Sequence, residues 1–412
     1  MESIKRYIPF FTSAFIMCVL LMIICPYYKY YVDPDAVAYL TIAKRYAKGD
    51  IANAINGYWS PWSCWLVALM IKSGFDDLIS MVIINSIGAI GLLYISQSFF
   101  LKYGLVKKLQ WALNITLALF LCYAIFWQSF DDIWECFFLL AALRVMLNDK
   151  FSTSPALWTL TGITGTLAYF AKAYAFPFFI LNVTCCTYLI DRKQWLKISA
   201  TIIFIMVFCS SGWIYLLHQK YGIWTTSTAG TLNMSWYLVG HPHFKEGITH
   251  LVPPHNTGSP YYWEDPWSAN GDRPQFWSSG QLFGRQILKG GYNFLKFIVC
   301  ILQLSVLFPF IIWLAVKLLG SLKTKMLFPD KISIVALSFL LFPLAYMLIN
   351  FEPRYLWYML PLAMVMGGLY LQNKFGSKKQ SFDFFITLFA VSFLIIPAAG
   401  MKKLYKIGRA HV

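Results

Sequence analysis

Residues 7–40 read YIPFFTSAFIMCVLLMIICPYYKYYVDPDAVAYL and join an apolar run to a short acidic segment. The run at 7–27 is long enough to cross a bilayer, because a hydrocarbon core of about 30 Å takes about 20 apolar residues. Asp33 and Asp35 follow directly behind it. Ionisable groups held at a membrane boundary are costly and therefore indicate function. The rest of the chain is interpreted around this span and its two carboxylates.

The composition places the whole chain in the membrane class. Hydrophobic residues make up 58% of its 412 residues and charged residues 13%, with a mean hydropathy of +0.58, which excludes an ordinary soluble domain. Alternation over about ten residues does not recur, which disfavours a transmembrane barrel. We expect an all-α polytopic membrane protein with about eleven transmembrane helices. The predicted spans are 7–27, 78–100, 109–128, 133–147, 156–171, 174–190, 196–217, 294–319, 332–350, 355–371 and 382–400.

The basic residues predict which side of the membrane each segment faces. With a cytoplasmic N-terminus and alternating sides, the inner segments hold half of the 34 Lys and Arg residues but fewer than a third of the 18 Asp and Glu residues. This is a positive-inside distribution, so the net charge of +16 needs no nucleic-acid partner. We expect a multi-pass protein of the bacterial inner membrane, with its active site on the periplasmic face.

Two segments on the outer side are long enough to hold structure. In the first, at 27–77, apolar residues from Ala36 to Tyr46 recur at helical spacing, and Gly49 ends the predicted amphipathic helix. The second, at 218–293, is rich in Pro, Gly, Trp and His and has too little apolar periodicity for an independent domain. We predict that it forms an ordered lid.

Asp35 lies four residues before Tyr39 at the start of the predicted helix, and an aromatic-Ser-Pro turn follows. This arrangement resembles the first extracytoplasmic loop of the GT-C glycosyltransferases. That superfamily takes sugars from polyprenyl-phosphate carriers and includes lipid A aminoarabinose transferases and protein O-mannosyltransferases. Ala36 stands where several members carry a glutamate, and Asp33 could take its place. The resemblance implies that Asp35, with Asp33, supplies the catalytic carboxylates.

Two later stretches resemble the same family. Glu352-Pro353-Arg354-Tyr355 is similar to a Glu-x-Arg-Tyr stretch in an outer loop of bacterial members, and Lys172 stands in a short outer turn where members place Lys or Arg. A carboxylate can act as a general base, and cations stabilise a phosphate leaving group, for which the guanidinium fork is well shaped. The substrate-binding residues that the resemblance implies are Arg354, Lys172, Glu352, Tyr355 and Tyr39.

Each of these residues also has a structural interpretation. Asp35 can cap the helix that it opens, and Asp33 can form a turn with the proline that follows it. Arg354 and Glu352 can pair with each other, and Lys172 can extend along a helix end towards the interface. The membrane location and the aromatic spacing favour the catalytic interpretation of Asp35 and, slightly, substrate contact by Arg354. For Asp33 and Lys172 both interpretations stay open.

The other polar clusters carry less weight. For Asp131 and Asp132, in a short outer turn, a helix cap is favoured over a second acidic contribution to the site. The four histidines between 241 and 255 are more typical of loop hydrogen bonds than of a zinc site. The aromatic stretch 261–267 is predicted to stack on sugars or to lie in the membrane interface. No cofactor or metal is predicted, although a carboxylate and a carrier phosphate can share a divalent ion.

The favoured function is transfer of a sugar, with inversion, from a polyprenyl-phosphate donor to an extracytoplasmic glycan, lipid or protein in contact with membrane lipids. A transporter or lipid flippase is the main rival, but it would show internal repeats and matched broken helices. An O-antigen polymerase or ligase is kept open by the histidines and disfavoured by the early aspartate motif. We predict one transmembrane domain at 1–405. Residues 406–412 resemble translated adapter sequence, so a continuation past 405 is expected.

Overall fold

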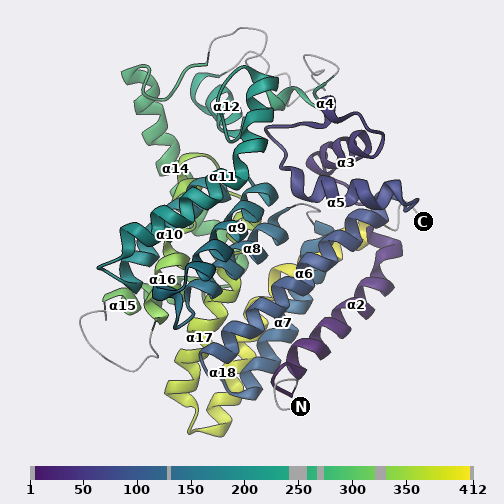
Figure 1. Ribbon diagram of the computed structural model, residues 1–412. Coiled ribbons are helices and arrows are strands. Elements are labelled where there is room, and N and C mark those ends of the chain that lie inside the picture. Colours follow the sequence, from purple (N-terminus) through teal and green to yellow (C-terminus); the bar gives the residue numbers. More distant parts are fainter. Residues whose placement is uncertain (1–4, 128–130, 241–257, 267–272, 321–330, 409–412) are drawn as a thin grey trace.

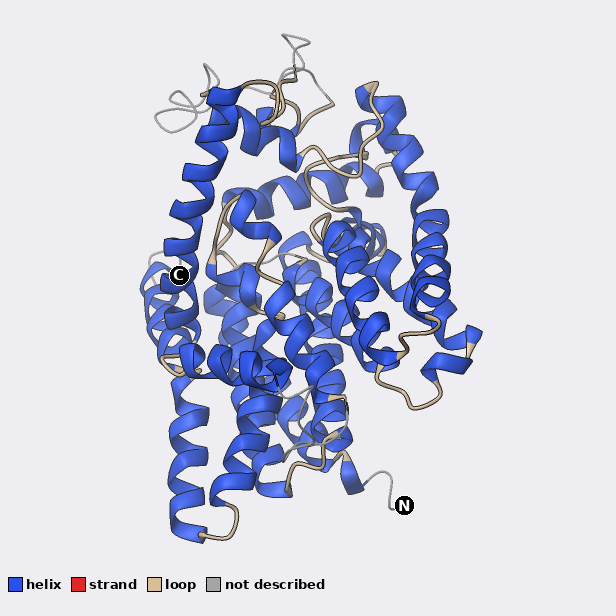
Figure 2. Ribbon diagram, turned by 90° about the vertical axis from the view of Figure 1, so that its left-hand side faces the viewer, coloured by secondary structure: helices blue, strands red, loops and turns tan. Residues whose placement is uncertain are grey.

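The computed structural model describes residues 5–127, 131–240, 258–266, 273–320 and 331–408. Figure 2 shows helices and loops and no strand over these residues, which confirms the all-α prediction. The helices are α2 (Ile8–Tyr28), α3 (Pro34–Ala47), α4 (Ile51–Ala54), α5 (Pro61–Lys72), α6 (Asp77–Lys102), α7 (Lys107–Trp127), α8 (Asp132–Met146), η1 (Phe151–Thr153), α9 (Pro155–Ala171), α10 (Ala175–Ile190), α11 (Trp195–Tyr221), α12 (Ala229–Asn233), η2 (Met234–Val239), η3 (Tyr262–Glu264), α14 (Gly280–Leu304), α15 (Phe308–Gly320), α16 (Ile332–Leu341), η5 (Ala345–Leu348), η6 (Pro353–Leu356), α17 (Met359–Phe375), α18 (Lys379–Ser392) and α19 (Ile395–Gly408).

The described residues contain five helices that are long and apolar enough to cross a membrane: α2, α6, α7, α11 and α14. The pair α18 and α19, bent by 41°, would make a sixth. The predicted count of about eleven spans is therefore not confirmed. Most of the other predicted spans coincide with helices of 10–17 residues, because turns interrupt the apolar runs.

The predicted span 294–319 is wrong in both its start and its continuity. Its helix starts earlier, at Gly280, and ends at Leu304, with α15 following from Phe308. Ser305 makes the break, because its hydroxyl accepts a hydrogen bond from the Leu307 amide at 3.1 Å and pairs with the Ser392 hydroxyl at 2.7 Å. Hydropathy does not detect such a break, since one serine hardly changes the mean of an apolar window.

The early start of α14 shortens the second outer segment. Arg285 donates to the Leu238 carbonyl at 2.6 Å, and the Lys289 ammonium lies 3.5 Å from the centre of the Tyr237 ring. Both of these cations therefore interact with residues of the second outer segment. These contacts explain how a helix with exposed apolar side chains can also carry charged residues. At the other end of the segment, α11 continues to Tyr221.

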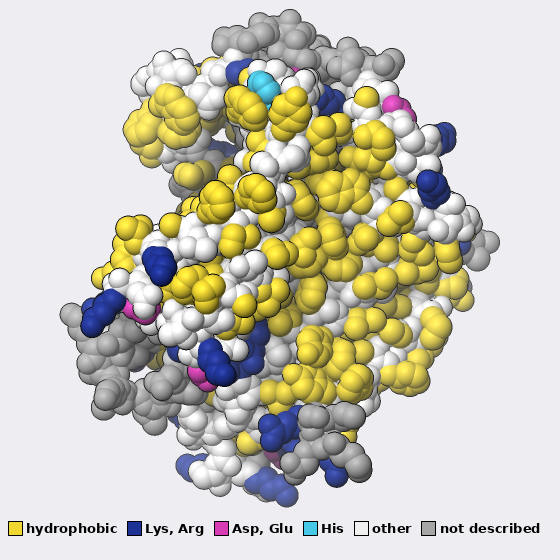
Figure 3. Space-filling view, in the orientation of Figure 1, with side chains coloured by type: hydrophobic (Ala, Val, Ile, Leu, Met, Phe, Trp, Pro, Cys, Tyr) yellow, Lys and Arg dark blue, Asp and Glu magenta, His cyan; other side chains and the backbone are white. Residues whose placement is uncertain are grey.

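The surface agrees with a membrane environment. Large apolar side chains are exposed on α2, α11 and α14, for example Phe15 (68%), Phe208 (68%) and Leu288 (76%). Figure 3 shows a broad apolar face over the middle of the molecule, with Lys and Arg gathered at its lower end. Such a continuous patch is far larger than a soluble monomer exposes.

The two outer segments meet at the end of the molecule that lies opposite the N-terminus. Figure 1 shows α3, α4 and α12 there, above the long helices. α3 lies where the sequence predicts an amphipathic helix, and Gly49 adopts a left-handed φ of +80° directly after it. The buried helices α7, α8 and α17 form the central core below. This arrangement places the ends of α8 and α9 under α3.

Candidate active site

Asp33 and Asp35 take different roles at the start of α3. The Asp33 carboxylate accepts a hydrogen bond from the Ala36 amide at 3.1 Å, so Asp33 caps the helix. Asp35 lies in the first turn, and its side chain points away from the helix terminus towards Trp59 and Arg354. The capping alternative for Asp35 is therefore wrong, and Asp33 takes the cap in place of the turn with Pro34 that the sequence offered.

Arg354 is the centre of an ion-pair network. Its Nη2 lies 3.2 Å from Asp35 Oδ2, and its Nε donates to Glu352 Oε2 at 2.8 Å. Its Nη1 lies 3.9 Å from Asp132 Oδ2. The Trp59 indole donates to Asp35 Oδ1 at 3.3 Å. Arg354 is only 9% exposed, so this network fixes the carboxylate of α3 against the late segment of the chain.

Lys172 is drawn into the protein instead of extending to the interface. It follows the last residue of α9, where the backbone becomes extended. Its ammonium pairs with Asp132, lies 3.8 Å from Glu135 Oε2, and sits 4.3 Å from the centre of the Tyr355 ring. The three groups hold the lysine next to Arg354, so the structure brings the two predicted phosphate-binding cations together.

Asp131 does not act as the cap that the sequence favoured. The N-terminus of α8 has no side-chain cap hydrogen bond. The Asp131 carboxyl instead accepts from the Ser63 amide at 3.2 Å and from the Ser63 hydroxyl, and it is hydrogen-bonded to Tyr39. Burial and the neighbouring Asp132 raise the pKa of Asp131 well above its usual range. The helix cap that the sequence favoured for this pair is therefore wrong. Asp131 and Asp132 instead line the same cavity as Asp35 and Lys172.

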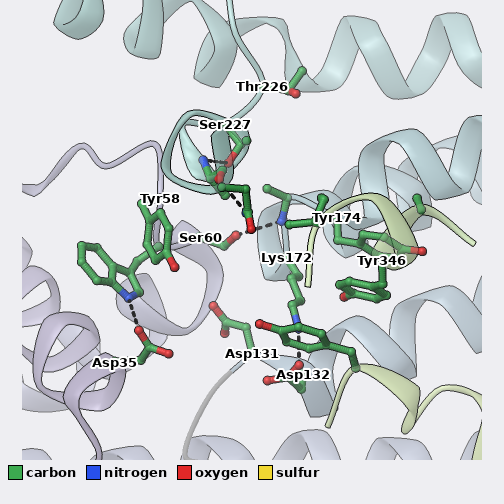
Figure 4. Close-up of a pocket in the computed structure, with 18 of the residues that line it drawn as sticks. Asp35, Tyr58, Ser60, Asp131, Asp132, Lys172, Tyr174, Thr226, Ser227 and Tyr346 are labelled. Carbon is green, nitrogen blue, oxygen red and sulfur yellow. Dashed lines mark hydrogen bonds and ion pairs between the residues drawn. The ribbon is translucent and has the colours of Figure 1, made fainter. Parts of the chain in front are cut away.

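A cavity of about 340 Å³ opens beside these residues, and we call it the lysine cavity. Figure 4 shows Asp35, Asp131 and Asp132 along it, with Lys172 pointing to Asp132. Tyr39 lines it as well, as the resemblance implied. Trp59 and Ser60 of the aromatic-Ser-Pro turn line it too. Further lining residues, which the sequence analysis did not single out, include Tyr58, Tyr174, Thr226, Ser227, Asn233, Ile349 and Tyr346.

A second cavity, of about 370 Å³, shares a wall with the first, and we call it the tryptophan cavity. The residues common to both are Asp35, Tyr58, Asn233, Ile349, Arg354 and Tyr355. The residues that line only the tryptophan cavity are Tyr31, Asp33, Pro34, Trp127, Leu232, Trp236, Tyr237, Trp263, Asn350 and Glu352.

The second outer segment is fastened to the turn after α4. The Ser227 hydroxyl and the Thr228 amide both donate to the Gly57 carbonyl at 2.8 Å. Glu264 is fully buried, pairs with Lys220 at 2.7 Å and accepts a hydrogen bond from the Tyr221 hydroxyl. These contacts hold the second segment against the turn whose residues Tyr58, Trp59 and Ser60 line the lysine cavity. The aromatic-Ser-Pro turn was the only sequence signal for them, because the partners lie about 165 residues away.

Carboxyl groups outnumber cations in the described part of the site. Asp33, Asp35, Asp131, Asp132, Glu135 and Glu352 surround Lys172 and Arg354. Burial raises the pKa of Asp33 to about 6, so this carboxyl ionises at a higher pH than a free aspartate. Over the described residues no group of three or more His, Cys, Asp or Glu could hold a metal ion. The four histidines between 241 and 255, which the sequence analysis weighed as a zinc site, lie outside the described residues.

No protein-family model and no curated protein sequence matches the chain. Solved structures of membrane enzymes are similar to it, among them the following two. ArnT from Cupriavidus metallidurans, bound to undecaprenyl phosphate, is 12% identical with a TM-score of 0.52, over 89% of this chain and 61% of that one. The oligosaccharyltransferase AglB from Archaeoglobus fulgidus, in complex with an inhibitory peptide and a dolichol-phosphate, is 14% identical with a TM-score of 0.52, over 100% of this chain and 56% of that one. The chain thus spans less than two thirds of either. Both are GT-C glycosyltransferases, so the resemblance is confirmed for the fold.

Proposed function

From this fold and this site, we propose that the chain is a membrane glycosyltransferase. It transfers a sugar from a polyprenyl-phosphate carrier to a hydroxyl or amine on a glycan, lipid or protein acceptor outside the cytoplasm. The observation that carries the proposal is the position of Asp35. Its carboxylate lies on the wall shared by both cavities and 3.2 Å from the guanidinium of Arg354. A base and a phosphate-binding cation are therefore adjacent.

The residues divide the chemistry as follows. Asp35 accepts the proton of the acceptor group as that group attacks the anomeric carbon of the donor. The bond between this carbon and the carrier phosphate breaks, and the phosphate leaves with the bonding electrons. Arg354 and Lys172 stabilise the charge that develops on its oxygens. Attack opposite the leaving group inverts the configuration at the anomeric carbon. No step is assigned to a metal ion.

The membrane orientation belongs to the same proposal. The site lies at the end of the molecule opposite the N-terminus, and Lys and Arg gather at the N-terminal end. A positive-inside arrangement then puts the N-terminus in the cytoplasm and the site on the periplasmic face of a bacterial inner membrane. The carrier would approach from the bilayer, and the acceptor would reach the site from the outer side.

The test uses the chain in lipid nanodiscs with radiolabelled undecaprenyl-phosphate sugars and a cell-envelope extract as the source of acceptor. Release of free carrier phosphate is measured for the wild type and for Asp35→Asn. We expect release by the wild type and a fall of about 10³-fold or more in the variant, because the amide cannot take the proton. Asp76→Asn is the matched control, since Asp76 caps α6 by accepting from the Ile79 amide, lines neither cavity, and Asn keeps an acceptor for the helix cap.

Equal release by the wild type and Asp35→Asn would remove Asp35 from the chemistry. Absence of release with every donor, together with movement of labelled lipid between the leaflets of reconstituted vesicles, would replace the transferase by a lipid flippase.

A further inference from the structure

We infer that the tryptophan cavity binds the acceptor and that its chemistry selects a sugar which is neutral or carries an amino group, and rejects an anionic one. The inference rests on the proposed function, because it names the acceptor class of the same site. It starts from a difference between the two cavities: Lys172 lines only the lysine cavity, whereas Glu352 and Asp33 line only the tryptophan cavity.

Aromatic rings provide the surface on which a sugar ring can lie. Trp236 and Trp263 meet edge to face with their centroids 5.1 Å apart, and Tyr58 lies 6.5 Å from Trp263. Tyr31 and Trp127 stack at 6.0 Å and line the same cavity. Such rings offer a rigid apolar face at a low entropic cost, and the negative face of the π system attracts C–H groups and cations. This lining suits a carbohydrate and does not require a long acyl chain.

The charges of the cavity disfavour an anion. Asp33, Asp35 and Glu352 line it, and its one cation among the described residues is Arg354. The guanidinium is already held by Glu352 at 2.8 Å and by Asp35 at 3.2 Å. Three carboxylates therefore face one cation in the described part of this cavity, whereas in the lysine cavity Lys172 adds a second cation. An anionic ligand is disfavoured in the tryptophan cavity relative to the lysine cavity, and an ammonium group is attracted to it. Hydroxyl groups can donate to the same carboxylates.

The volume and the shared wall complete the argument. About 370 Å³ is within the range of small-molecule pockets, and it suits one or two sugar rings better than a folded peptide. Because Asp35 lines both cavities, a hydroxyl bound beside Trp263 faces the proposed base from one side. The sugar phosphate of the donor, held by Lys172 and Arg354 in the adjoining lysine cavity, meets the acceptor at the residues common to both cavities.

Binding of simple glycosides to the full chain in nanodiscs, without any donor, tests the inference. The probes are methyl glucoside (neutral), methyl glucosaminide (cationic at neutral pH) and methyl glucuronide (anionic), followed by saturation-transfer-difference NMR. We expect the glucosaminide to bind at least as tightly as the glucoside. The glucuronide should bind at least about tenfold more weakly than either, which corresponds to about 1.4 kcal/mol.

Variants locate the binding site. Trp263→Ala should weaken the binding of the glucoside and the glucosaminide about tenfold or more, because it removes the ring face on which the sugar lies. Trp263→Phe should keep most of it, which separates loss of stacking from loss of fold. Trp277→Ala is the matched control, because Trp277 is 67% exposed and lines neither cavity. Glu352→Gln should reduce the preference for the glucosaminide over the glucoside.

Glucuronide binding as tight as that of the other probes, or binding unchanged by Trp263→Ala, overturns the inference. These results are distinguishable from failure of the proposed function. If carrier phosphate is released but the glycosides do not bind selectively, the transferase stands and its acceptor is of another class. If the glycosides bind selectively but no donor releases phosphate, the cavity binds sugar and the transferase proposal fails.

Discussion

The lysine cavity and the tryptophan cavity share a wall, yet their charged groups serve opposite needs. In the first, Lys172 adds a second cation next to Arg354 and opposite Asp132. In the second, Asp33 and Glu352 add carboxylates and no further cation is described. Two neighbouring cavities that bound parts of one substrate would be expected to carry similar charges. The difference in charge indicates that each cavity is suited to a different substrate, and that the shared residues Asp35 and Arg354 contact both substrates.

The largest effect is expected for Arg354→Ala, because Arg354 lines both cavities. The change leaves Asp35 and Glu352 without their cation, and removal of one member of a buried ion pair costs about 3–5 kcal/mol. We expect a large fall in the thermal unfolding temperature and a loss of carrier-phosphate release of about 10³-fold. Arg354→Lys keeps the charge but not the fork, so it should recover stability more than activity. Equal activity of Arg354→Ala and the wild type would contradict the shared role.

A change confined to the lysine cavity tests whether the two cavities bind different substrates. Lys172→Met removes the ammonium and keeps the length of the side chain, and we expect phosphate release to fall about 10²-fold through the rate constant. The KM for the acceptor should stay the same, since Lys172 does not line the tryptophan cavity. Lys102→Met, which removes a cation paired with Asp149 outside both cavities, is the control. An increase in the acceptor KM of Lys172→Met would show that the two cavities are not functionally separate.

The smallest effect is expected for the dependence of stability on pH through Asp33, on the tryptophan side. Burial raises the pKa of Asp33 from 3.8 to about 6 in the folded chain, so folding favours the protonated carboxyl. Its contribution is present in full below pH 3.8 and is lost as the pH rises through 6, up to about 3 kcal/mol.

Asp33→Asn has no carboxyl to ionise, so it should not lose this stability as the pH rises. Between pH 4 and 8, its unfolding temperature should therefore fall less than that of the wild type. Unfolding temperatures of the wild type and the variant, measured between pH 4 and 8, check it. Parallel curves for the two proteins would show that Asp33 does not titrate in this range.

Much of the candidate site could be predicted from the sequence because it is encoded locally. The spacing of Asp35 and Tyr39 on one helix, and the short Glu352–Tyr355 stretch, single out candidate residues without knowledge of the fold. The all-helical class follows from the composition, the apolar runs and the lack of strand-like alternation. The structure then joins Lys172 to this set through Asp132, which explains why a lysine at the end of α9 is not a mere interface residue.

The rest could not be predicted because it depends on contacts between distant segments. An aspartate in front of a helix, such as Asp131, is indistinguishable in sequence from a helix cap. In the structure its carboxyl binds the amide and hydroxyl of Ser63 instead of the helix terminus. The break at Ser305 depends on Ser392 in another helix. Hydropathy windows average over such single residues and so do not detect where an apolar run is interrupted. The tryptophan cavity draws Trp127, Trp236 and Trp263 from three different segments, and no periodicity connects them.

The contact between Asp35 and Arg354 also sets an order in time. The two residues are 319 positions apart in the chain. At about 5–20 residues per second, the ribosome makes the arginine roughly 15–60 s after the aspartate. The helix that carries Asp35 is therefore produced long before its cation exists, and the pair can close only after synthesis has passed residue 354. A nascent chain that has not yet reached Arg354 consequently lacks the contact that joins α3 to the late segment.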